Sequence, residues 1–298
     1  MVTTPRQVID AVLRSVCGRA VERLAPLGGG GMNETYRVEL QNDVAVVARI
    51  ARQPGPWFTD EEHVMAQARA VGVPTPEVLG VEQVDHEGAL LSFSIQRLLP
   101  GRALDALVGK LPVSDLERLV TDGGELLARV HSLVPDRGIR HELRPPEERD
   151  VARVARIVGE ALGPAAAAAV RRGADLLRAE VMTRPAPTLS LAHGDFLPKN
   201  LLIDGGAIVG VIDWEFAGPA SPAFDFARWE VSAGHPLHDR SDLLRRGYAR
   251  VADPDEAGGG WVRAFAIDWA LEKLGWRNPA SPAQFRRCVD VIARYATA

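Results

Sequence analysis

The sequence changes character at residues 98–101, where Leu98-Leu99-Pro100-Gly101 interrupts the chain. Before this point, apolar and β-branched runs between turn residues predict strands over residues 35–40, 44–50, 78–83 and 90–96. Beyond it, apolar residues recur mainly at helical spacing. A chain divided in this way predicts an α+β fold of two lobes, with an N-lobe over residues 1–97 and a C-lobe over residues 98–298.

Apolar periodicity predicts the remaining elements. Two helices are expected in the N-lobe, over residues 5–17 and 59–71. The C-lobe is expected to hold helices over residues 114–132, 147–162, 165–183, 222–232, 240–251, 261–277 and 283–296. Ser114 and Glu117 have the spacing of a capping box, which would begin the first of these helices. A strand over residues 189–193 and a hairpin around Asp204-Gly205-Gly206 interrupt the helical series.

Charge and cysteine content exclude several classes of protein. The 298 residues include 35 Lys and Arg against 39 Asp and Glu, and 46% are hydrophobic, as in an ordinary soluble globular protein. Such a balance gives no general attraction to nucleic acid or to an anionic membrane, and no apolar run is long enough to span one. Cys17 and Cys288 lack disulfide or zinc spacing. We therefore expect a cytoplasmic monomer or weak dimer without nucleic-acid or membrane partners.

The motif with most chemical content is His193-Gly194-Asp195-Phe196-Leu197-Pro198-Lys199-Asn200, directly after the predicted strand 189–193. The hairpin that follows should return the chain so that Asp213 emerges beside Asn200. One carboxylate and one amide oxygen would then be within reach of Mg²⁺, a hard cation that takes oxygen ligands. Asp195 would be available to accept the proton of an attacking hydroxyl, as an aspartate does in phosphoryl transfer.

Each of these pieces is a weak signal alone, because an isolated His-Gly-Asp is most often a turn. Their order is more specific: a glycine run, a basic residue on the next strand, an acid on the next helix, then Asp195, Asn200 and Asp213. In this order the sequence resembles the aminoglycoside phosphotransferase family, small-molecule kinases with a protein-kinase-like fold, from about residue 20 to residue 280. The resemblance implies a small antiparallel N-lobe sheet, a site between the lobes, and ATP or GTP with Mg²⁺ as cofactors.

The resemblance also implies which residues bind the phosphates of the nucleotide. A covering loop would approach them with the backbone N–H groups of Gly29, Gly30 and Gly31. Asn33 belongs to the same loop. Arg49 stands where kinases generally place a strand lysine, and its planar fork can grip phosphate oxygens. Glu61, or its neighbour Glu62, would orient Arg49.

Further positions take their interpretation from the same resemblance. Gln96 and Leu98 correspond to the hinge, where backbone groups hydrogen-bond adenine. Lys199 could reach a phosphate, although a solvent-facing position in its loop is equally open. His193 is interpreted as packing and hydrogen bonding the catalytic loop. Gly194 stands where many protein kinases carry an arginine that binds a phosphorylated activation loop, so this form of switching would lack its receptor.

The favoured function is Mg²⁺-dependent transfer of the γ-phosphate of ATP or GTP to a hydroxyl of a small molecule, first of all an aminoglycoside-like or other antibiotic. Alternatives are a kinase of a small metabolite such as choline, homoserine or an amino sugar, and a catalytically silent nucleotide-binding regulator. Asp225 is interpreted as a buried brace. Only eleven residues separate Asp213 from Asp225, too few for an activation segment that lays out a peptide, so a protein kinase ranks last.

The helix predicted over residues 261–277 offers a candidate acceptor surface. At about 100° per residue, its aliphatic residues share one side and its aromatic and acidic residues the other, namely Phe265, Asp268, Trp269, Glu272 and Trp276. Such a face suits a cationic ring substrate, because carboxylates pair with ammonium groups and indoles provide cation–π contacts. The alternative is a helix buried on both sides, whose acids pair with neighbouring arginines.

Overall fold

The N-terminal part of the chain forms a five-stranded antiparallel sheet with strand order β1-β2-β3-β5-β4. The structure is a computed structural model that describes residues 3–27, 33–52, 57–143, 150–234, 236–253, 255, 259–275 and 281–297. The strands are β1 (Val21–Pro26), β2 (Glu34–Leu40), β3 (Val44–Ala51), β4 (Val78–His86) and β5 (Ala89–Arg97). This sheet confirms the α+β class expected from the sequence, whereas the boundary between residues 97 and 98 stays a prediction.

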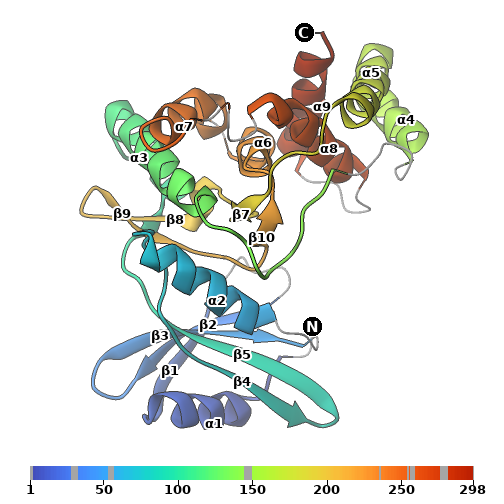
Figure 1. The fold of residues 1–298 in the computed structure, drawn as a ribbon. Helices are drawn as coiled ribbons and strands as arrows, with labels where there is room; N and C mark the ends of the chain where they lie inside the picture. The colour runs from blue at the N-terminus through green and yellow to red at the C-terminus, as the bar shows by residue number, and fades with distance from the viewer. Residues whose placement is uncertain are drawn as a thin grey trace.

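Two helices, α1 (Arg6–Cys17) and α2 (Trp57–Ala70), pack against this sheet (Figure 1). The amphipathic α1 covers it with Ile9, Val12 and Leu13. The residues of β3 in the same core are Val46, Ala48 and Ile50. Because successive side chains of a strand point to opposite faces, Arg49 lies on the other face of the sheet, where it meets α2.

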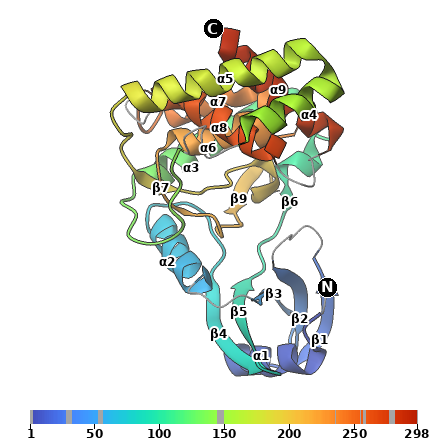
Figure 2. The ribbon, with the colours of Figure 1, turned by 90° about the vertical axis from the view of Figure 1, so that its right-hand side faces the viewer.

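Helices make up most of the rest of the molecule, on the side away from α1 (Figures 1 and 2). They are α3 (Val113–His131), α4 (Val151–Leu162), α5 (Pro164–Thr183), α6 (Ala223–Ser232), α7 (Ser241–Tyr248), α8 (Val262–Gly275) and α9 (Pro282–Thr297). α8 packs against both α6 and α9, and α5 packs against α8 and α9. The core that they share includes several large aromatic side chains: Trp214, Phe226, Trp229, Tyr248 and Phe265.

Two small sheets lie where the helical part faces the N-terminal sheet (Figures 1 and 2). One contains β6 (Arg102–Ala103), β8 (Leu201–Asp204) and β9 (Ala207–Val211), and the other pairs β7 (Ser190–Ala192) with β10 (Gly218–Ala220). The predicted hairpin is confirmed, because β8 and β9 pair in antiparallel register with Leu201 opposite Val211. This pairing brings residue 213 back beside residue 200.

Strand β1 and the start of α3 are among the local features that differ from the sequence-based expectation. The first strand, β1, has no buried residue, so its sequence carries no apolar pattern that would reveal it. The capping box expected at Ser114 and Glu117 is wrong, because α3 begins at Val113 after Pro112 and no side chain caps it. Ser114 therefore lies inside the first turn, where its hydroxyl is past the capping position.

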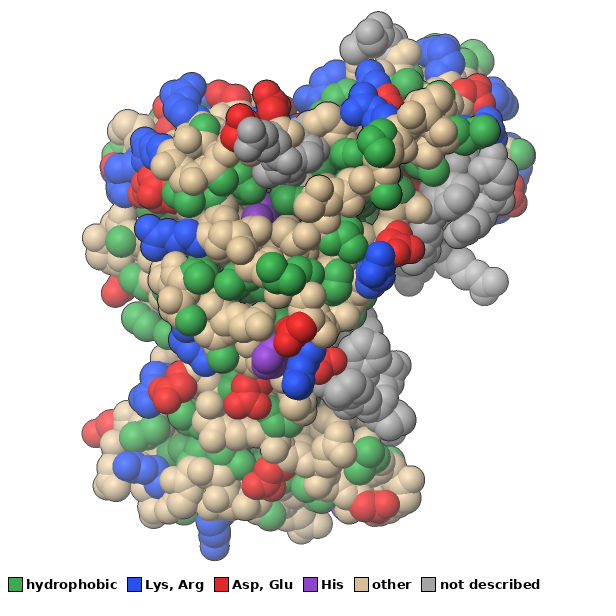
Figure 3. Space-filling view, in the orientation of Figure 1, with side chains coloured by type: hydrophobic (Ala, Val, Ile, Leu, Met, Phe, Trp, Pro, Cys, Tyr) green, Lys and Arg blue, Asp and Glu red, His purple; other side chains and the backbone are tan. Residues whose placement is uncertain are grey.

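The surface carries both signs of charge. On the face in Figure 3, positive and negative side chains are interspersed, and the molecule narrows between its two parts. Among the described residues, no helix combines the length and the apolar character needed to cross a membrane. Cys17 and Cys288 are free thiols.

Candidate active site

The loop after β7 carries the predicted catalytic aspartate, and helix α6 holds this loop in place. Asp225 on α6 is fully buried and accepts hydrogen bonds from the backbone N–H groups of His193 (2.8 Å) and Gly194 (2.9 Å). His131 Nε2 lies 3.1 Å from the same carboxylate. Gly194 has a φ of 80°, in the left-handed region that glycine tolerates. The buried brace expected at Asp225 is confirmed by these contacts.

His193 is a structural part of this loop. Its Nε2 lies 3.1 Å from the carbonyl oxygen of Ile212, and its Nδ1 accepts the N–H of Asp195 at 3.2 Å. Complete burial lowers the pKa of His193 and so favours the neutral ring. A neutral ring with both nitrogens engaged fits the packing role that the sequence suggested.

Asp195 is 2% exposed and contacts two cations. Arg228 on α6 pairs with Oδ1, and Lys199 Nζ lies 2.7 Å from Oδ2. Asn200 Nδ2 donates to the carbonyl oxygen of Asp195 (2.8 Å) and to Oδ2 (3.1 Å). Burial alone would raise the pKa of Asp195, but the charges of Arg228 and Lys199 outweigh it and lower that pKa to about 2. The carboxylate is therefore ionised at neutral pH.

The two predicted metal ligands are brought together by the β8–β9 hairpin. The N–H of Ile212 donates to the carbonyl oxygen of Asn200 at 3.0 Å, so Asp213 follows directly beside Asn200. Asp213 itself has a left-handed φ of 67°, and its side chain is 31% exposed. In the described part of the chain, no group of three or more His, Cys, Asp or Glu side chains is arranged around a common metal position. Two oxygen ligands nevertheless fit Mg²⁺, which usually completes its shell with phosphates and waters.

Arg49 lies at the centre of a second charged cluster. Its Nη1 pairs with Glu61, and its Nη2 lies 3.0 Å from Glu215 and 3.4 Å from Asp213. Asn33 Nδ2 donates to the same Glu215 oxygen at 2.8 Å. Burial raises the pKa of Glu215, and the neighbouring charge of Asp213 raises it further. The partner of Arg49, which the sequence left open between two glutamates, is Glu61, while Glu62 makes no ion pair with Arg49.

The other nucleotide-binding predictions are only partly covered by the described residues. Gly29, Gly30 and Gly31 lie outside them. Gln96 is paired on both sides, with Val47 of β3 and Val78 of β4, and its buried side chain donates to Ser94 Oγ at 3.1 Å. The N–H of Leu98 lies 3.4 Å from the carbonyl oxygen of Ala45. Lys199 contacts Asp195, as described above.

Helix α8 is buried on most of its circumference, as the alternative interpretation anticipated. Asp268 is 7% exposed and Glu272 is partly buried, and both take part in interactions of their own. Trp269 Nε1 donates to Ser232 Oγ at 3.0 Å, and the guanidinium of Arg228 lies 3.9 Å from the centroid of the Trp269 ring. Trp276 lies outside the described residues. Trp269, one of the predicted acceptor residues, lies close to the Asp195 cluster through its contact with Arg228.

The sequence interpretation missed two charged residues of the site. Arg228 follows Asp225 by three residues, so both lie on one side of α6 and face the catalytic loop. The predicted brace at Asp225 was therefore the signal that could have identified Arg228. Glu215 follows Asp213 by two residues, and its contact with Arg49 depends on the left-handed backbone at Asp213, which no sequence pattern signals.

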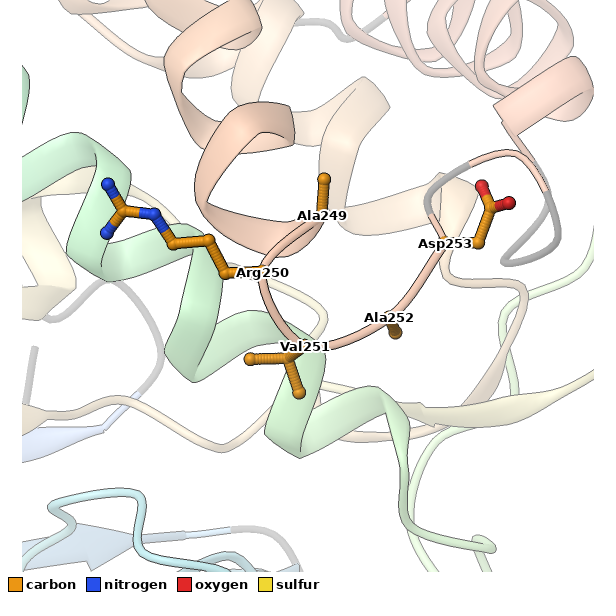
Figure 4. A pocket seen from close by; sticks show the side chains of 5 residues that line it. All are labelled: Ala249, Arg250, Val251, Ala252 and Asp253. Carbon is orange, nitrogen blue, oxygen red and sulfur yellow. The ribbon is translucent and has the colours of Figure 1, made fainter.

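Two hollows of the described structure differ in position. One, of about 330 Å³, lies beside the Arg49 cluster and is lined in part by Glu61, Trp214 and Glu215. The other, of about 470 Å³, is an open depression along the turn at residues 249–253 (Figure 4). In this turn Arg250 and Asp253 point away from each other, and Arg250 pairs with Glu125 on α3 at 2.6 Å. Only the first hollow adjoins groups suited to catalysis.

Comparison with known proteins gives a consistent result. Residues 23–273 match the model of the phosphotransferase enzyme family, APH. A thermostable mutant of aminoglycoside phosphotransferase APH(4)-Ia, in a ternary complex with ADP and hygromycin B, is 20% identical, with a TM-score of 0.66 over 97% of this chain and 99% of that chain. Spectinomycin phosphotransferase APH(9)-Ia, in complex with ADP and spectinomycin, is 12% identical, with a TM-score of 0.74 over 100% and 99%.

A third similar structure is a putative aminoglycoside phosphotransferase from Ralstonia eutropha JMP134, with 16% identity and a TM-score of 0.62 over 98% of each chain. No curated protein matches the sequence. At these identities the solved structures establish the shared fold, and the family match extends over most of the chain.

Proposed function

Because the chain belongs to the phosphotransferase enzyme family, we propose that it transfers the γ-phosphate of ATP to a hydroxyl group of a small molecule in a Mg²⁺-dependent reaction. The observation that supports the proposal is the convergence of an ionised carboxylate, two side chains with oxygen atoms suited to Mg²⁺ and a buried arginine. These groups are Asp195, Asn200, Asp213 and Arg49. They come from separate segments of the chain, so their meeting depends on the whole fold.

In this proposal the nucleotide end of the site is built around Arg49. Asn200 and Asp213 hold Mg²⁺, which supplies positive charge to the phosphate oxygens when it is bound. Arg49 contacts the phosphates and is oriented by Glu61. Asn33 and the preceding loop, with Gly29, Gly30 and Gly31, cover them, and the adenine binds at Gln96 and Leu98. GTP remains an alternative nucleotide.

Asp195 acts as the general base. Its carboxylate is ionised and buried, and it accepts the proton of the acceptor hydroxyl while the hydroxyl oxygen attacks the γ-phosphorus. Lys199, 2.7 Å from Asp195, is placed to contact the transferred phosphoryl group as well. Catalysis then consists of positioning and of charge stabilisation, which is the usual balance in phosphoryl transfer.

Antibiotics are the first acceptors to examine, since two solved relatives hold hygromycin B and spectinomycin. A small-metabolite kinase is the second candidate. The cationic acceptor expected from the sequence stays a prediction, and the Trp269 ring that was to receive an ammonium group already faces the guanidinium of Arg228. A protein without nucleic-acid or membrane partners, monomeric or weakly dimeric and cytoplasmic, completes the proposal, and the two free cysteines support a reducing compartment.

A coupled assay of ADP release tests the proposed function. The panel contains aminoglycoside, peptide and macrolide antibiotics, choline, homoserine and amino sugars, each with Mg·ATP. We expect acceptor-dependent ADP release that Asp195→Ala abolishes, while calorimetry shows that this variant still binds Mg·ATP. A protein that binds Mg·ATP and releases no ADP with any hydroxyl compound would instead be the silent nucleotide-binding regulator.

A further inference from the structure

Arg228 on α6 is a buried cation beside the predicted base. Its side chain is 8% exposed and pairs with Asp195 Oδ1. Aromatic rings surround the guanidinium, with Trp269 at 3.9 Å, Phe224 at 5.8 Å and Phe216 at 6.0 Å from its central carbon to the ring centroids. Contact with aromatic rings orients a guanidinium. Its N–H groups point outward in the guanidinium plane and remain available for hydrogen bonds.

Most of the hydrogen-bonding capacity of Arg228 is unused. A guanidinium has five N–H donors in a planar fork. Within the described residues, its one hydrogen bond is the contact of Nη2 with Asp195, and Nε is buried without any partner. An unsatisfied donor in a buried side chain is costly, so Arg228 calls for a partner that the described residues do not supply.

Two lysines add positive charge near Arg228. Lys199 contacts the other oxygen of Asp195, and Lys273 of α8 lies 5.2 Å from the centroid of the Trp269 ring, which also faces Arg228. Burial lowers the pKa of Lys273, and the charge of Arg228 lowers it further. Asp195 thus pairs with two of these cations, Arg228 and Lys199, and Lys273 adds a third near the Trp269 ring. The acids on α8, Asp268 and Glu272, are engaged in interactions of their own.

We infer that Arg228 binds an oxyanion of the acceptor, a carboxylate or a phosphate, located close to the hydroxyl that receives the phosphoryl group. The fork of Arg228 matches the paired oxygens of such a group, and its contact with Asp195 fixes the distance between oxyanion and reacting hydroxyl. This inference rests on the proposed function. It names an anionic acceptor class in place of a cationic one.

The γ-phosphate of the nucleotide is the other oxyanion that could approach Asp195. The surroundings of Arg228 favour the acceptor, because its neighbours Phe224 and Trp269 come from α6 and α8. The nucleotide end of the site is held by Arg49, which lies on the sheet and contacts Glu61, Asp213 and Glu215. Each arginine therefore serves a different substrate.

The first experiment uses the unmodified protein and two series of acceptors that differ in charge. One series is D-glucose, D-glucosamine, D-glucuronate and D-glucose 6-phosphate, and the other is glycerol, 3-amino-1,2-propanediol, D-glycerate and glycerol 3-phosphate. ADP release with Mg·ATP gives kcat and KM for each compound. We expect the anionic members to exceed their neutral and cationic counterparts in kcat/KM by roughly 10- to 100-fold. Carboxylate and phosphate members distinguish the two sources of the oxyanion.

The second experiment uses Arg228→Gln, with Arg228→Lys to retain the charge without the fork. Arg228→Gln should raise KM for the best anionic acceptor by roughly 10- to 100-fold, and Arg228→Lys should recover part of this loss. Calorimetry with Mg·AMP-PNP should show unchanged nucleotide affinity. Arg246→Gln is the matched control, because Arg246 lies on α7 with its side chain 67% exposed. Thermal melting confirms that each variant is folded.

Three results would overturn the inference. In the first, neutral or cationic acceptors are the best substrates in both series. In the second, Arg228→Gln weakens binding of Mg·AMP-PNP and leaves the acceptor KM unchanged, which would assign Arg228 to the γ-phosphate. In the third, the protein binds Mg·ATP and transfers phosphate to other hydroxyl compounds but to no anionic member. Failure to bind Mg·ATP at all would count against the proposed function instead.

Discussion

The two charged clusters of the site are opposite in sign. In the first, one arginine, Arg49, contacts three carboxylates: Glu61, Asp213 and Glu215. In the second, one carboxylate, Asp195, contacts two cations: Lys199 and Arg228. The first cluster gathers residues of β3, α2 and the segment after β9, and the second gathers residues of the catalytic loop and α6.

This difference assigns a ligand to each cluster by charge alone. An excess of carboxylates favours a divalent cation, which can in turn hold the phosphates of a nucleotide. An excess of cations around a buried carboxylate favours an anionic group. The site therefore consists of two halves of opposite charge, and each half can be tested by changing one residue.

Removal of Asp213 should have the largest effect, because it deletes the proposed metal ligand of the negative cluster. We expect Asp213→Ala to abolish Mg²⁺-supported ATP binding and to lower kcat/KM by roughly 10⁴-fold or more. Calorimetry with and without Mg²⁺ measures the binding, and ADP release measures the turnover. If the variant bound Mg·ATP like the parent, the proposal that this cluster binds the metal would be wrong.

Removal of Asp195 should distinguish the function of the positive cluster from that of the negative cluster. We expect Asp195→Ala to lower kcat by roughly 10²- to 10⁴-fold, the usual contribution of a general base, while affinity for Mg·ATP stays close to that of the parent. The same calorimetry and ADP-release measurements apply. If Asp195→Ala lost nucleotide binding as Asp213→Ala does, the division into a nucleotide half and an acceptor half would be wrong.

The positive cluster also predicts a dependence of stability on pH. The folded pKa of Asp195 is about 2, below the 3.8 that is usual for an aspartate. Its ion pairs therefore stabilise the fold above about pH 4, and this contribution of about 2 kcal/mol is lost as the pH falls from about 4 toward 2. Urea unfolding at a series of pH values should show that the gap between parent and Asp195→Asn narrows over this range. Asp175→Asn is the control, because the Asp175 side chain on α5 is 73% exposed. A gap that stays constant down to pH 2 would contradict the depressed pKa.

The smallest effect is expected from dephosphorylation. Both clusters are assembled in the protein without a modified residue, and position 194 is a glycine where an arginine would bind a phosphorylated loop. Treatment with a broad phosphatase should therefore change kcat by less than about twofold. Activity that appears only after another kinase has acted would show that the clusters as described are not the working arrangement.

Much of this arrangement could be predicted because it follows from local pattern. The hairpin signal at Asp204-Gly205-Gly206 placed Asp213 beside Asn200, and the structure has that pairing. Strand alternation likewise accounts for Arg49 lying on the face opposite the core residues Ala48 and Ile50. In these cases the period of the backbone determines which side chains meet.

Prediction from the sequence was incomplete where contacts depend on packing between distant segments. Arg228 and Asp195 meet because α6 packs on the loop that carries Asp195. No sequence pattern around either residue predicts this contact. Trp269 looked available for a ligand because its helix shows a mixed aromatic and acidic face, yet the docking of α6 on α8 brings Arg228 over its ring. Only the tertiary structure shows that a protein cation occupies that place.

The backbone at Gly194 has a consequence for how this protein can evolve. A Cβ atom at this position would lie 2.1 Å from the carbonyl oxygen of Phe216, and the φ of 80° is itself unfavourable for other residues. A single substitution to arginine would therefore distort the loop that carries Asp195 before it could create a phosphate receptor. Control by phosphorylation at this place would require several coordinated changes in the loop.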